Sequence, residues 1–245
     1  MAAILSVTES TKKLSLVNAT GDDSQSLQDF LLPDLQQFTR EGVYSNTASK
    51  DFHLFYVGRD NVHEILKYVL SRCSVSLYLN MFGYDDDELN DAILALMASP
   101  NVAVQGTLDR SQAGGVHERA ILASDLKDNP DFYNSFVITT SATHQISHTK
   151  GGVLIAQGLW FEGSANWSGS GEGTGIKLAA GTGLNAARDT PAPGFKAQNN
   201  TLLVSANPVG LTRFGARLDV EHRTGMQQQA ARDAKAAAAK VTEGQ

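Results

Sequence analysis

The stretch HTKGGVLIAQGLWFEGSANWS, residues 148–168, places polar side chains at both ends of an apolar hairpin. His148 and Lys150 stand two residues apart before the apolar run, and Ser164 and Asn166 stand two apart after it. Alternate residues of a strand share one face, so each pair is expected to point in one direction. If the two apolar runs pair through the glycine between them, all four side chains gather at one end of a sheet.

These four residue types suit chemistry on a phosphate diester. Such a reaction needs a nucleophile for phosphorus and preorganised donors for the phosphoryl oxygens. His148 is a base or nucleophile, Lys150 is a cation, and both Ser164 and Asn166 are hydrogen-bond donors. Each residue alone is equally well understood as a polar residue at a strand end. Their joint arrangement is what predicts a phosphate site.

The rest of the chain alternates between strand and helix patterns. Strands are predicted at 52–58, 74–82, 101–109, 135–141, 151–157, 159–165 and 199–208, and helices at 59–73, 85–100, 115–128 and 209–225. This alternation predicts one α/β domain with a mixed, largely parallel sheet flanked by helices. Asp60 or Asn61 is the expected N-cap of the first helix. The acidic run 85–87 favours a helix start over a cation site, because no further ligands follow at a recognisable spacing.

Composition divides the chain and limits its function. Residues 1–50 read as an N-terminal extension, 51–224 as the α/β domain with a Gly-rich loop at 169–197, and 225–245 as a helical or disordered tail. A net charge of −6 argues against a general nucleic-acid coat but leaves room for a local basic groove.

The cysteine content and the apolar runs of the sequence bear on the compartment of the protein. Cys73 is the one cysteine, which suits a reducing compartment, and its apolar surroundings predict burial. No signal peptide and no run of about 18 apolar residues is seen, so the expectation is a cytoplasmic protein without a transmembrane segment.

His-x-Lys followed by Gly-Ser-x-Asn resembles the phospholipase D superfamily, and in particular its single-motif, bacterial endonuclease-like branch. The resemblance covers most of residues 52–223, including the segment ending in Asp109, Arg110 and Ser111. It implies a phospholipase D-like fold and a metal-independent phosphodiesterase without a cofactor. It also implies that His148 forms a phosphohistidine while Lys150 holds the phosphoryl oxygens.

The same resemblance assigns roles to further residues. Ser164 and Asn166 would donate to the phosphoryl oxygens, while Gly163, Asn199 and Trp167 are expected to line the substrate site, with Trp167 either stacking a base, lining an acyl groove or packing in the core. Because the family reaction uses two histidines and this chain has one motif, the resemblance implies a homodimer.

Two positions depart from the family pattern. The motif aspartate corresponds to Ile155 or Ala156, and the glutamate of the following strand corresponds to Asn199, so both carboxylates are absent. A nuclease acting on DNA or RNA is the preferred function. A phospholipid hydrolase or transphosphatidylase, and a non-catalytic phosphate- or nucleic-acid-binding descendant, stay open as alternatives.

Several other polar residues are expected to have structural roles. His63, His117 and His222 are predicted to be solvated on helices. The segment 109–111 is read as a turn with a helix N-cap, with a role at the rim of the site as the alternative.

Overall fold

The computed structural model describes residues 4–8, 13–17, 24–26, 32–39, 51–128, 135–140, 146–174 and 196–243. Its main body is a seven-stranded sheet with the strand order β4-β10-β9-β8-β5-β6-β7. These strands are β4 (Phe52–Tyr56), β5 (Ser76–Met81), β6 (Ala103–Asp109), β7 (Ser135–Thr139), β8 (Lys150–Leu154), β9 (Leu159–Gly163) and β10 (Thr201–Ser205). All seven strands predicted from the sequence are therefore present.

The sheet is mixed, as predicted, but the expectation that it is largely parallel is wrong, because four of its six strand pairs are antiparallel. β5, β6 and β7 pair in parallel, whereas the pairs involving β8, β9, β10 and β4 are antiparallel. β8 and β9 form the expected hairpin, and its turn contains Gly158 at a φ of 63°, a conformation that glycine adopts without strain. Because β8 runs antiparallel to β5, the start of β8 lies at the same edge as the carboxyl ends of β5 and β6.

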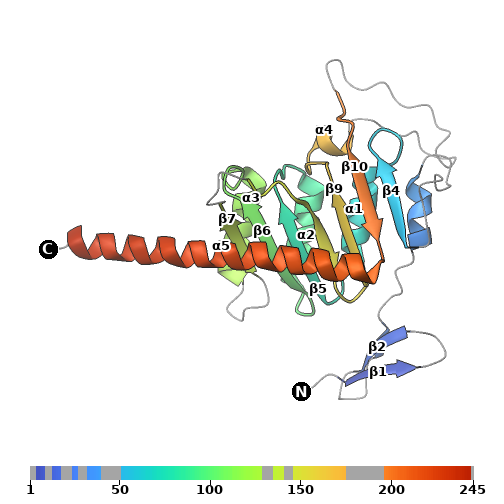
Figure 1. The fold of residues 1–245 in the computed structure, drawn as a ribbon, viewed down its shortest axis with the longest axis horizontal. Coiled ribbons are helices and arrows are strands. Elements are labelled where there is room, and N and C mark those ends of the chain that lie inside the picture. Colours follow the sequence, from blue (N-terminus) through green and yellow to red (C-terminus); the bar gives the residue numbers. More distant parts are fainter. Residues whose placement is uncertain are drawn as a thin grey trace.

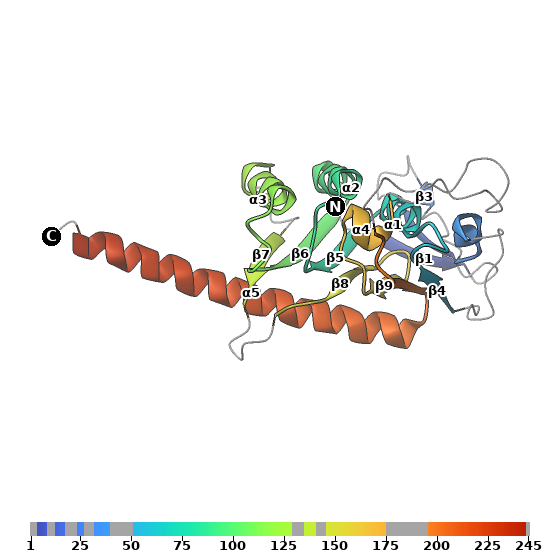
Figure 2. The same ribbon diagram turned by 90° about the horizontal axis from the view of Figure 1, so that it is seen from above.

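Helices cover both faces of the sheet. α1 (Val62–Ser71), α2 (Asp87–Ala98) and α3 (Val116–Asp128) lie on one face, and α5 (Pro208–Glu243) crosses the other (Figures 1 and 2). α1 begins at the predicted N-cap Asn61, whose side chain accepts a hydrogen bond from the Glu64 amide. The apolar face predicted for α1 is buried; it comprises Val62, Ile65, Leu66 and Val69.

α5 is longer than the sequence pattern predicted. It runs without a break through the expected start of the tail and extends beyond the β7 edge of the sheet (Figure 1). Its first half packs on the sheet, where Leu218 is buried, while the alanine-rich second half is largely exposed. Strong helix propensity thus continues the helix where the apolar stripe ends.

The remaining elements are short. A 3-10 helix at Leu32–Phe38 contributes Leu32 and Leu35 to the core, and β1 (Ile4–Thr8), β2 (Lys13–Val17) and β3 (Ser24–Ser26) form a separate three-stranded sheet. The loop predicted at 169–197 begins instead with a helical turn, α4 (Gly169–Glu172), and its residues 175–195 lie outside the described part of the chain. No helix among the described residues is long and apolar enough to cross a membrane.

Candidate active site

His148 and Lys150 lie where β8 begins, next to the carboxyl end of β5. Lys150 pairs with Met81 across the β5–β8 ladder, and His148 precedes the strand with an exposed side chain. Phe82 places its ring close to both functional groups. Its ring lies 4.4 Å from the imidazole of His148 and 4.9 Å from Nζ of Lys150, measured to ring centroids.

Lys150 is a buried cation without an anionic partner. Its residue is 3 % exposed, and its Nζ donates a 2.8 Å hydrogen bond to the carbonyl oxygen of His148. No carboxylate among the described residues forms an ion pair with it. Burial lowers the pKa of Lys150 from 10.5 to about 8. A buried cation with neutral neighbours is costly by itself, and an anion placed beside it would remove that cost.

The imidazole of His148 is tuned toward its neutral form. Partial burial and the charge of Lys150 lower its pKa, while Asp109 opposes them. A neutral imidazole has a free nitrogen lone pair at neutral pH, which is the form that can attack phosphorus. The two side chains therefore combine an imidazole that favours its neutral form with a cation that has no carboxylate partner among the described residues.

Two buried carboxylates hold the segment that carries His148. Asp109, at the end of β6, accepts a 2.7 Å hydrogen bond from the Ser147 amide, and Glu221 of α5 accepts a 2.7 Å bond from the Ser147 hydroxyl. Glu221 also accepts a hydrogen bond from Asn80 of β5. Asp109 also accepts hydrogen bonds from the amide and hydroxyl of Ser111, as the predicted turn requires, but α3 begins only at Val116, so the segment 109–111 does not supply its N-cap.

Ser164 contacts the neighbouring strand. Its hydroxyl donates a 3.0 Å hydrogen bond to Oδ1 of Asn200 and accepts one of 3.0 Å from the Thr201 amide. Asn200 in turn donates to the carbonyl of Gly171 in α4. In this arrangement the serine proton is already used, so it must rotate before it can donate to a substrate oxygen.

Asn166 faces a polar cavity. Its Oδ1 is buried and has no hydrogen-bond partner in the part of the chain that the structure describes. The cavity has a volume of about 460 Å³ and lies between the end of β5 and the first turn of α3. Besides Asn166, its lining includes Tyr84, Ser111, Glu118 and Ser168. Gly83 packs so closely on Asn166 that a Cβ there would lie 2.8 Å from its Cγ.

The four motif residues thus occupy one end of the sheet in three separate environments. No hydrogen bond, ion pair or ring contact among described residues joins His148 or Lys150 to Ser164 or Asn166. The extension of β5 links the two halves: the Phe82 amide bonds the Thr149 carbonyl, and the Gly83 carbonyl bonds the Trp167 amide. The hairpin brings the motif together at one sheet edge, as the sequence predicts, without direct contacts between its halves.

The three residues expected to line the substrate site differ in their surroundings. Trp167 is 1 % exposed and stacks on Phe161 in the core, so the interpretation that it stacks a base is corrected. Gly163 lies against β10, where a Cβ would come within 2.3 Å of the Thr201 carbonyl oxygen. Asn199 is exposed, and Asn200 is the residue that contacts Ser164.

The missing motif aspartate lies far from the candidate nucleophile. Ile155 is 46 % exposed in the turn that ends β8, and Ala156 follows it in the same turn. His148 precedes the other end of that strand. Seven residues of extended chain span about 23 Å, so a carboxylate at Ile155 cannot reach the imidazole.

Three histidines predicted to be solvated differ in burial. His63 of α1 and His222 of α5 are buried, at 8 % and 3 % exposed, which corrects the prediction for both. The ring of His222 contacts the Ser135 hydroxyl and the Gly106 carbonyl in the sheet. His117 is partly exposed near Asp87. Cys73 is buried as predicted, and burial raises its pKa to about 12.

Comparison with solved structures identifies the architecture. NucT from Helicobacter pylori matches with a TM-score of 0.51 and 14 % identity over 71 % of this chain and 96 % of that one. Nuc from Salmonella typhimurium, a phospholipase D family member, matches with a TM-score of 0.48 and 13 % identity over 71 % and 95 %. The chain has the phospholipase D-like fold. The resemblance inferred from the sequence is therefore confirmed for the fold.

Phosphatidylserine synthase from Haemophilus influenzae also matches, with a TM-score of 0.46 and 8 % identity over 71 % of this chain and 39 % of that one. No family model and no curated protein matches the chain. At such identities the likeness describes the fold, and the activity has to be argued from the site.

Proposed function

We propose that this chain is a phosphodiesterase that acts through a phosphohistidine on His148. The observation that carries the proposal is the buried, unpaired Lys150 beside the exposed, neutral-tending His148. A phosphoryl group next to His148 would supply the anion that Lys150 lacks. The lysine would also oppose the charge that grows on the phosphoryl oxygens as His148 attacks.

The proposed reaction has two steps. A ring nitrogen of His148 forms a bond to phosphorus, the bond from phosphorus to the leaving oxygen breaks, and a general acid protonates that oxygen. Water then cleaves the phosphorus–nitrogen bond and releases a phosphate monoester. Asn166 and, after rotation, Ser164 would donate to the phosphoryl oxygens, so these steps use charge stabilisation from the chain itself and no metal.

A homodimer would supply the general acid. The chain has one copy of the motif, and a second imidazole is needed to protonate the leaving oxygen. The exposure of His148 supports this arrangement, because a second copy can approach it directly. Ile146, which is 54 % exposed two residues earlier, offers an apolar contact at the same edge. A two-fold axis near these residues would bring the two histidines to one phosphate.

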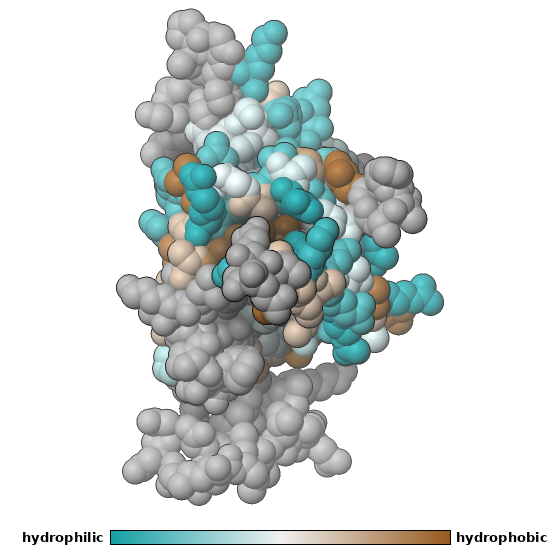
Figure 3. Space-filling view, turned by 90° about the vertical axis from the view of Figure 1, so that its left-hand side faces the viewer, coloured by the Kyte–Doolittle hydropathy of each residue, from teal (hydrophilic) through white to brown (hydrophobic). Residues whose placement is uncertain are grey.

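Nucleic acid is the substrate class that we propose. The cavity beside Asn166 is lined mainly by polar residues, which suits a sugar-phosphate chain better than an acyl chain. A phospholipid site would favour a continuous apolar rim, whereas Val116 is the one exposed aliphatic side chain among the described residues that line the cavity. On the face seen in Figure 3, the described hydrophobic residues are interspersed with hydrophilic ones.

Diester hydrolysis in EDTA tests the proposal. The purified chain would be offered bis(p-nitrophenyl) phosphate, single-stranded DNA, RNA and phospholipid vesicles, beside the variants His148→Ala and His117→Ala. Turnover of the model diester and of DNA or RNA is expected for the wild type and for His117→Ala, and loss is expected for His148→Ala. A denaturing quench at high pH should trap a base-stable, acid-labile phosphoenzyme that His148→Ala lacks.

Other outcomes would change the assignment. Cleavage of phospholipid in place of nucleic acid would select the lipase alternative. A wild type that is inactive on every diester, yet binds DNA or phosphate through Lys150, would be the non-catalytic descendant. Full activity of His148→Ala would exclude the phosphohistidine mechanism.

The homodimer has its own test. Light scattering at micromolar concentration should give twice the mass of the chain. Mixed dimers with one His148→Ala subunit should lose most of their turnover if both histidines serve one phosphate. A monomer with full activity would contradict the shared site.

A further inference from the structure

A second cluster of ionisable side chains lies away from His148, where α1, α2 and α4 meet. His63 is in the first turn of α1, Asp86 is the N-cap of α2, and Glu172 ends α4. Nδ1 of His63 lies 2.6 Å from Oε2 of Glu172 and 3.5 Å from Oδ2 of Asp86. One nitrogen and two carboxylate oxygens thus converge from three separate elements.

The cluster is buried and incompletely satisfied. The Glu172 side chain is 0 % exposed, and those of His63 and Asp86 are each 10 % exposed. Oε1 of Glu172 is buried and has no hydrogen-bond partner among the described residues. A carboxylate oxygen in that position is costly to bury unless something positive binds it. The second carboxylate, on Asp86, adds to that cost because the two negative charges face one imidazole.

We propose that His63, Asp86 and Glu172 bind one divalent transition-metal ion, Zn²⁺ or Mn²⁺, that fixes α4 against α1 and α2. The ligand atoms all lie within 4.8 Å of one another. Ligands about 2.1 Å from one ion are about 3–4 Å apart, so modest movements would complete the coordination. The dipositive charge would balance the two carboxylates, and the orphaned oxygen of Glu172 would become a ligand.

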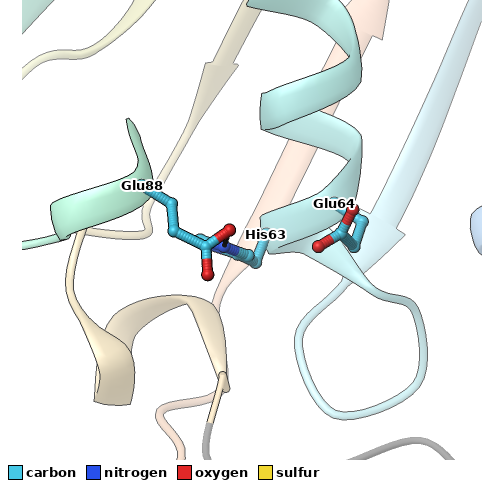
Figure 4. A group of neighbouring side chains, drawn as sticks. All are labelled: His63, Glu64 and Glu88. Atoms are coloured by element: carbon cyan, nitrogen blue, oxygen red, sulfur yellow. Dashed lines mark ion pairs between the residues drawn. The ribbon is translucent and has the colours of Figure 1, made fainter. Parts of the chain in front are cut away.

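The far side of the imidazole supports this assignment. Nε2 of His63 lies 3.6 Å from Oε2 of Glu88, and Figure 4 shows that carboxylate beside the ring. Nδ1 of His63 shares a 2.6 Å hydrogen bond with Oε2 of Glu172, and a bound ion would take the place of the shared proton. The Glu88 carboxylate would then hold the remaining proton on Nε2, as is common for metal-bound histidines. Imidazole with carboxylates suits the borderline ion Zn²⁺ best; the harder Mn²⁺ also accepts carboxylates and binds more tightly than Mg²⁺, which prefers oxygen ligands alone.

A second group of possible ligands, formed by His63, Glu64 and Glu88, is the weaker choice. Both of its carboxylates are already paired with Lys67, at 2.9 Å for Glu64 and at a shorter contact for Glu88. The Glu88 side chain is also 62 % exposed. Competition from the lysine and from water would weaken metal binding there.

The ion would have a consequence for the candidate active site. α4 follows Asn166 directly, and the Asn166 carbonyl accepts a 2.9 Å hydrogen bond from the Ser168 amide. Fixing Glu172 therefore fixes the turn that carries Asn166. The proposed role is structural, so it stands independently of the proposed phosphodiesterase activity.

Metal titration of the untagged full chain tests the site. After EDTA treatment and removal of the chelator, ZnCl₂ should bind at one equivalent with a dissociation constant in the micromolar range or below. Saturation should raise the melting temperature by several degrees. MnCl₂ should act in the same way, and MgCl₂ at the same concentrations should leave the melting temperature unchanged.

Matched variants locate the ligands. Glu172→Gln keeps the shape of the side chain and should weaken Zn²⁺ binding at least 100-fold, whereas Glu64→Gln should change it less than 3-fold. Asp86→Asn keeps a good N-cap and gives a second ligand test if Glu172→Gln does not fold. Co²⁺ should give visible absorption bands that Glu64→Gln retains and Glu172→Gln loses.

Three results would overturn the proposal. The first is a folded wild type that binds neither Zn²⁺ nor Mn²⁺. The second is Zn²⁺ binding that survives both Glu172→Gln and Asp86→Asn. The third is Mg²⁺ binding as tight as that of Zn²⁺, which would indicate an ordinary acidic patch. Each readout is independent of catalysis, so an inactive enzyme would leave the metal test intact.

Discussion

Replacing Lys150 with methionine should abolish turnover and make the fold more stable. Lys150 is buried, and among the described residues its ammonium group has a carbonyl oxygen and an aromatic ring as neighbours but no carboxylate. Methionine has a similar length and flexibility and carries no charge. The substitution therefore removes the desolvated cation while keeping the apolar packing of its stem.

The magnitude follows from the pKa of Lys150. The pKa falls from 10.5 to about 8, so holding the lysine in its charged form costs the folded state about 3 kcal/mol. Loss of the hydrogen bond to the His148 carbonyl destabilises the variant by about 1 kcal/mol, and loss of the contact with the Phe82 ring destabilises it by about 0.5–1 kcal/mol. The net gain is about 1–2 kcal/mol, or about 2–8 °C in melting temperature for a chain of this size.

The gain should depend on pH in a defined direction. Between about 8 and 10.5 the unfolded chain binds the Lys150 proton more tightly than the folded chain does, so wild-type stability rises with pH in that window. Below about 8 both states are protonated and the full cost is present. The advantage of Lys150→Met should therefore be largest at pH 7 and should shrink by pH 10.

Differential scanning calorimetry at pH 7 and pH 10 checks the stability, and hydrolysis of bis(p-nitrophenyl) phosphate checks the activity. The loss of one charge-stabilising donor typically reduces turnover about 100- to 1000-fold. Lys235→Met, at an exposed position on α5, is the matched control and should change neither quantity. A Lys150→Met protein that melts several degrees lower at pH 7, or keeps its turnover, would refute the unpaired-cation reasoning.

Three further predictions concern the same edge of the sheet. The decline of kcat/KM with pH should steepen above about 8 as Lys150 loses its proton, and Lys150→Arg should remove that steepening because guanidinium does not titrate there. Ile155→Asp should keep turnover within about 2-fold and the melting temperature within about 2 °C of the wild type. Leu154→Asp, at the fully buried neighbouring position, should lower the melting temperature strongly. Improved turnover of Ile155→Asp would show that the position reaches the site. Turnover at 20 °C should persist in EDTA even where EDTA lowers the melting temperature, and activity restored by Mg²⁺ alone would contradict the metal-free chemistry.

The local pattern of the sequence was enough to predict most of the architecture. Apolar periodicity and capping residues placed α1, α2 and α3, and the alternating run after Lys150 predicted the hairpin. These signals are local, because each depends on residues within one or two turns. The continuation of α5 was left open, since helix propensity without an apolar stripe does not distinguish a solvated helix from a frayed end.

The site was less accessible to sequence reasoning. The motif spacing predicted a site at His148 and Lys150, but it could not predict that Lys150 is buried beside the Phe82 ring without a carboxylate partner among the described residues. Trp167 was given a substrate role as one alternative because it follows the motif, yet it belongs to the core. Its alternation with the preceding residues could not show that the chain turns there and that Trp167 pairs with Tyr84, just after β5.

Contacts between distant segments account for what the sequence could not show. The acidic start of α2 was read as a helix cap because no ligands follow Asp86 nearby in sequence. The cap is present, and its side chain accepts a hydrogen bond from the Leu89 amide. The residues grouped with Asp86 as possible metal ligands are His63, 23 positions earlier, and Glu172, 86 positions later. No spacing motif records such a set.

The same reasoning applies to the carboxylate that the motif lacks. Ile155 is separated from His148 by the whole of β8, so an aspartate there would act on the hairpin turn and leave His148 untouched. The carboxylates that do reach the segment before His148 are Asp109 and Glu221, which bond the backbone and hydroxyl of Ser147. They come from β6 and α5, outside the hairpin that defines the motif. The absence of an aspartate at Ile155 is therefore compatible with chemistry at His148. The substitutions expected to loosen the segment before His148 are those of Asp109 and Glu221, which lie outside the motif.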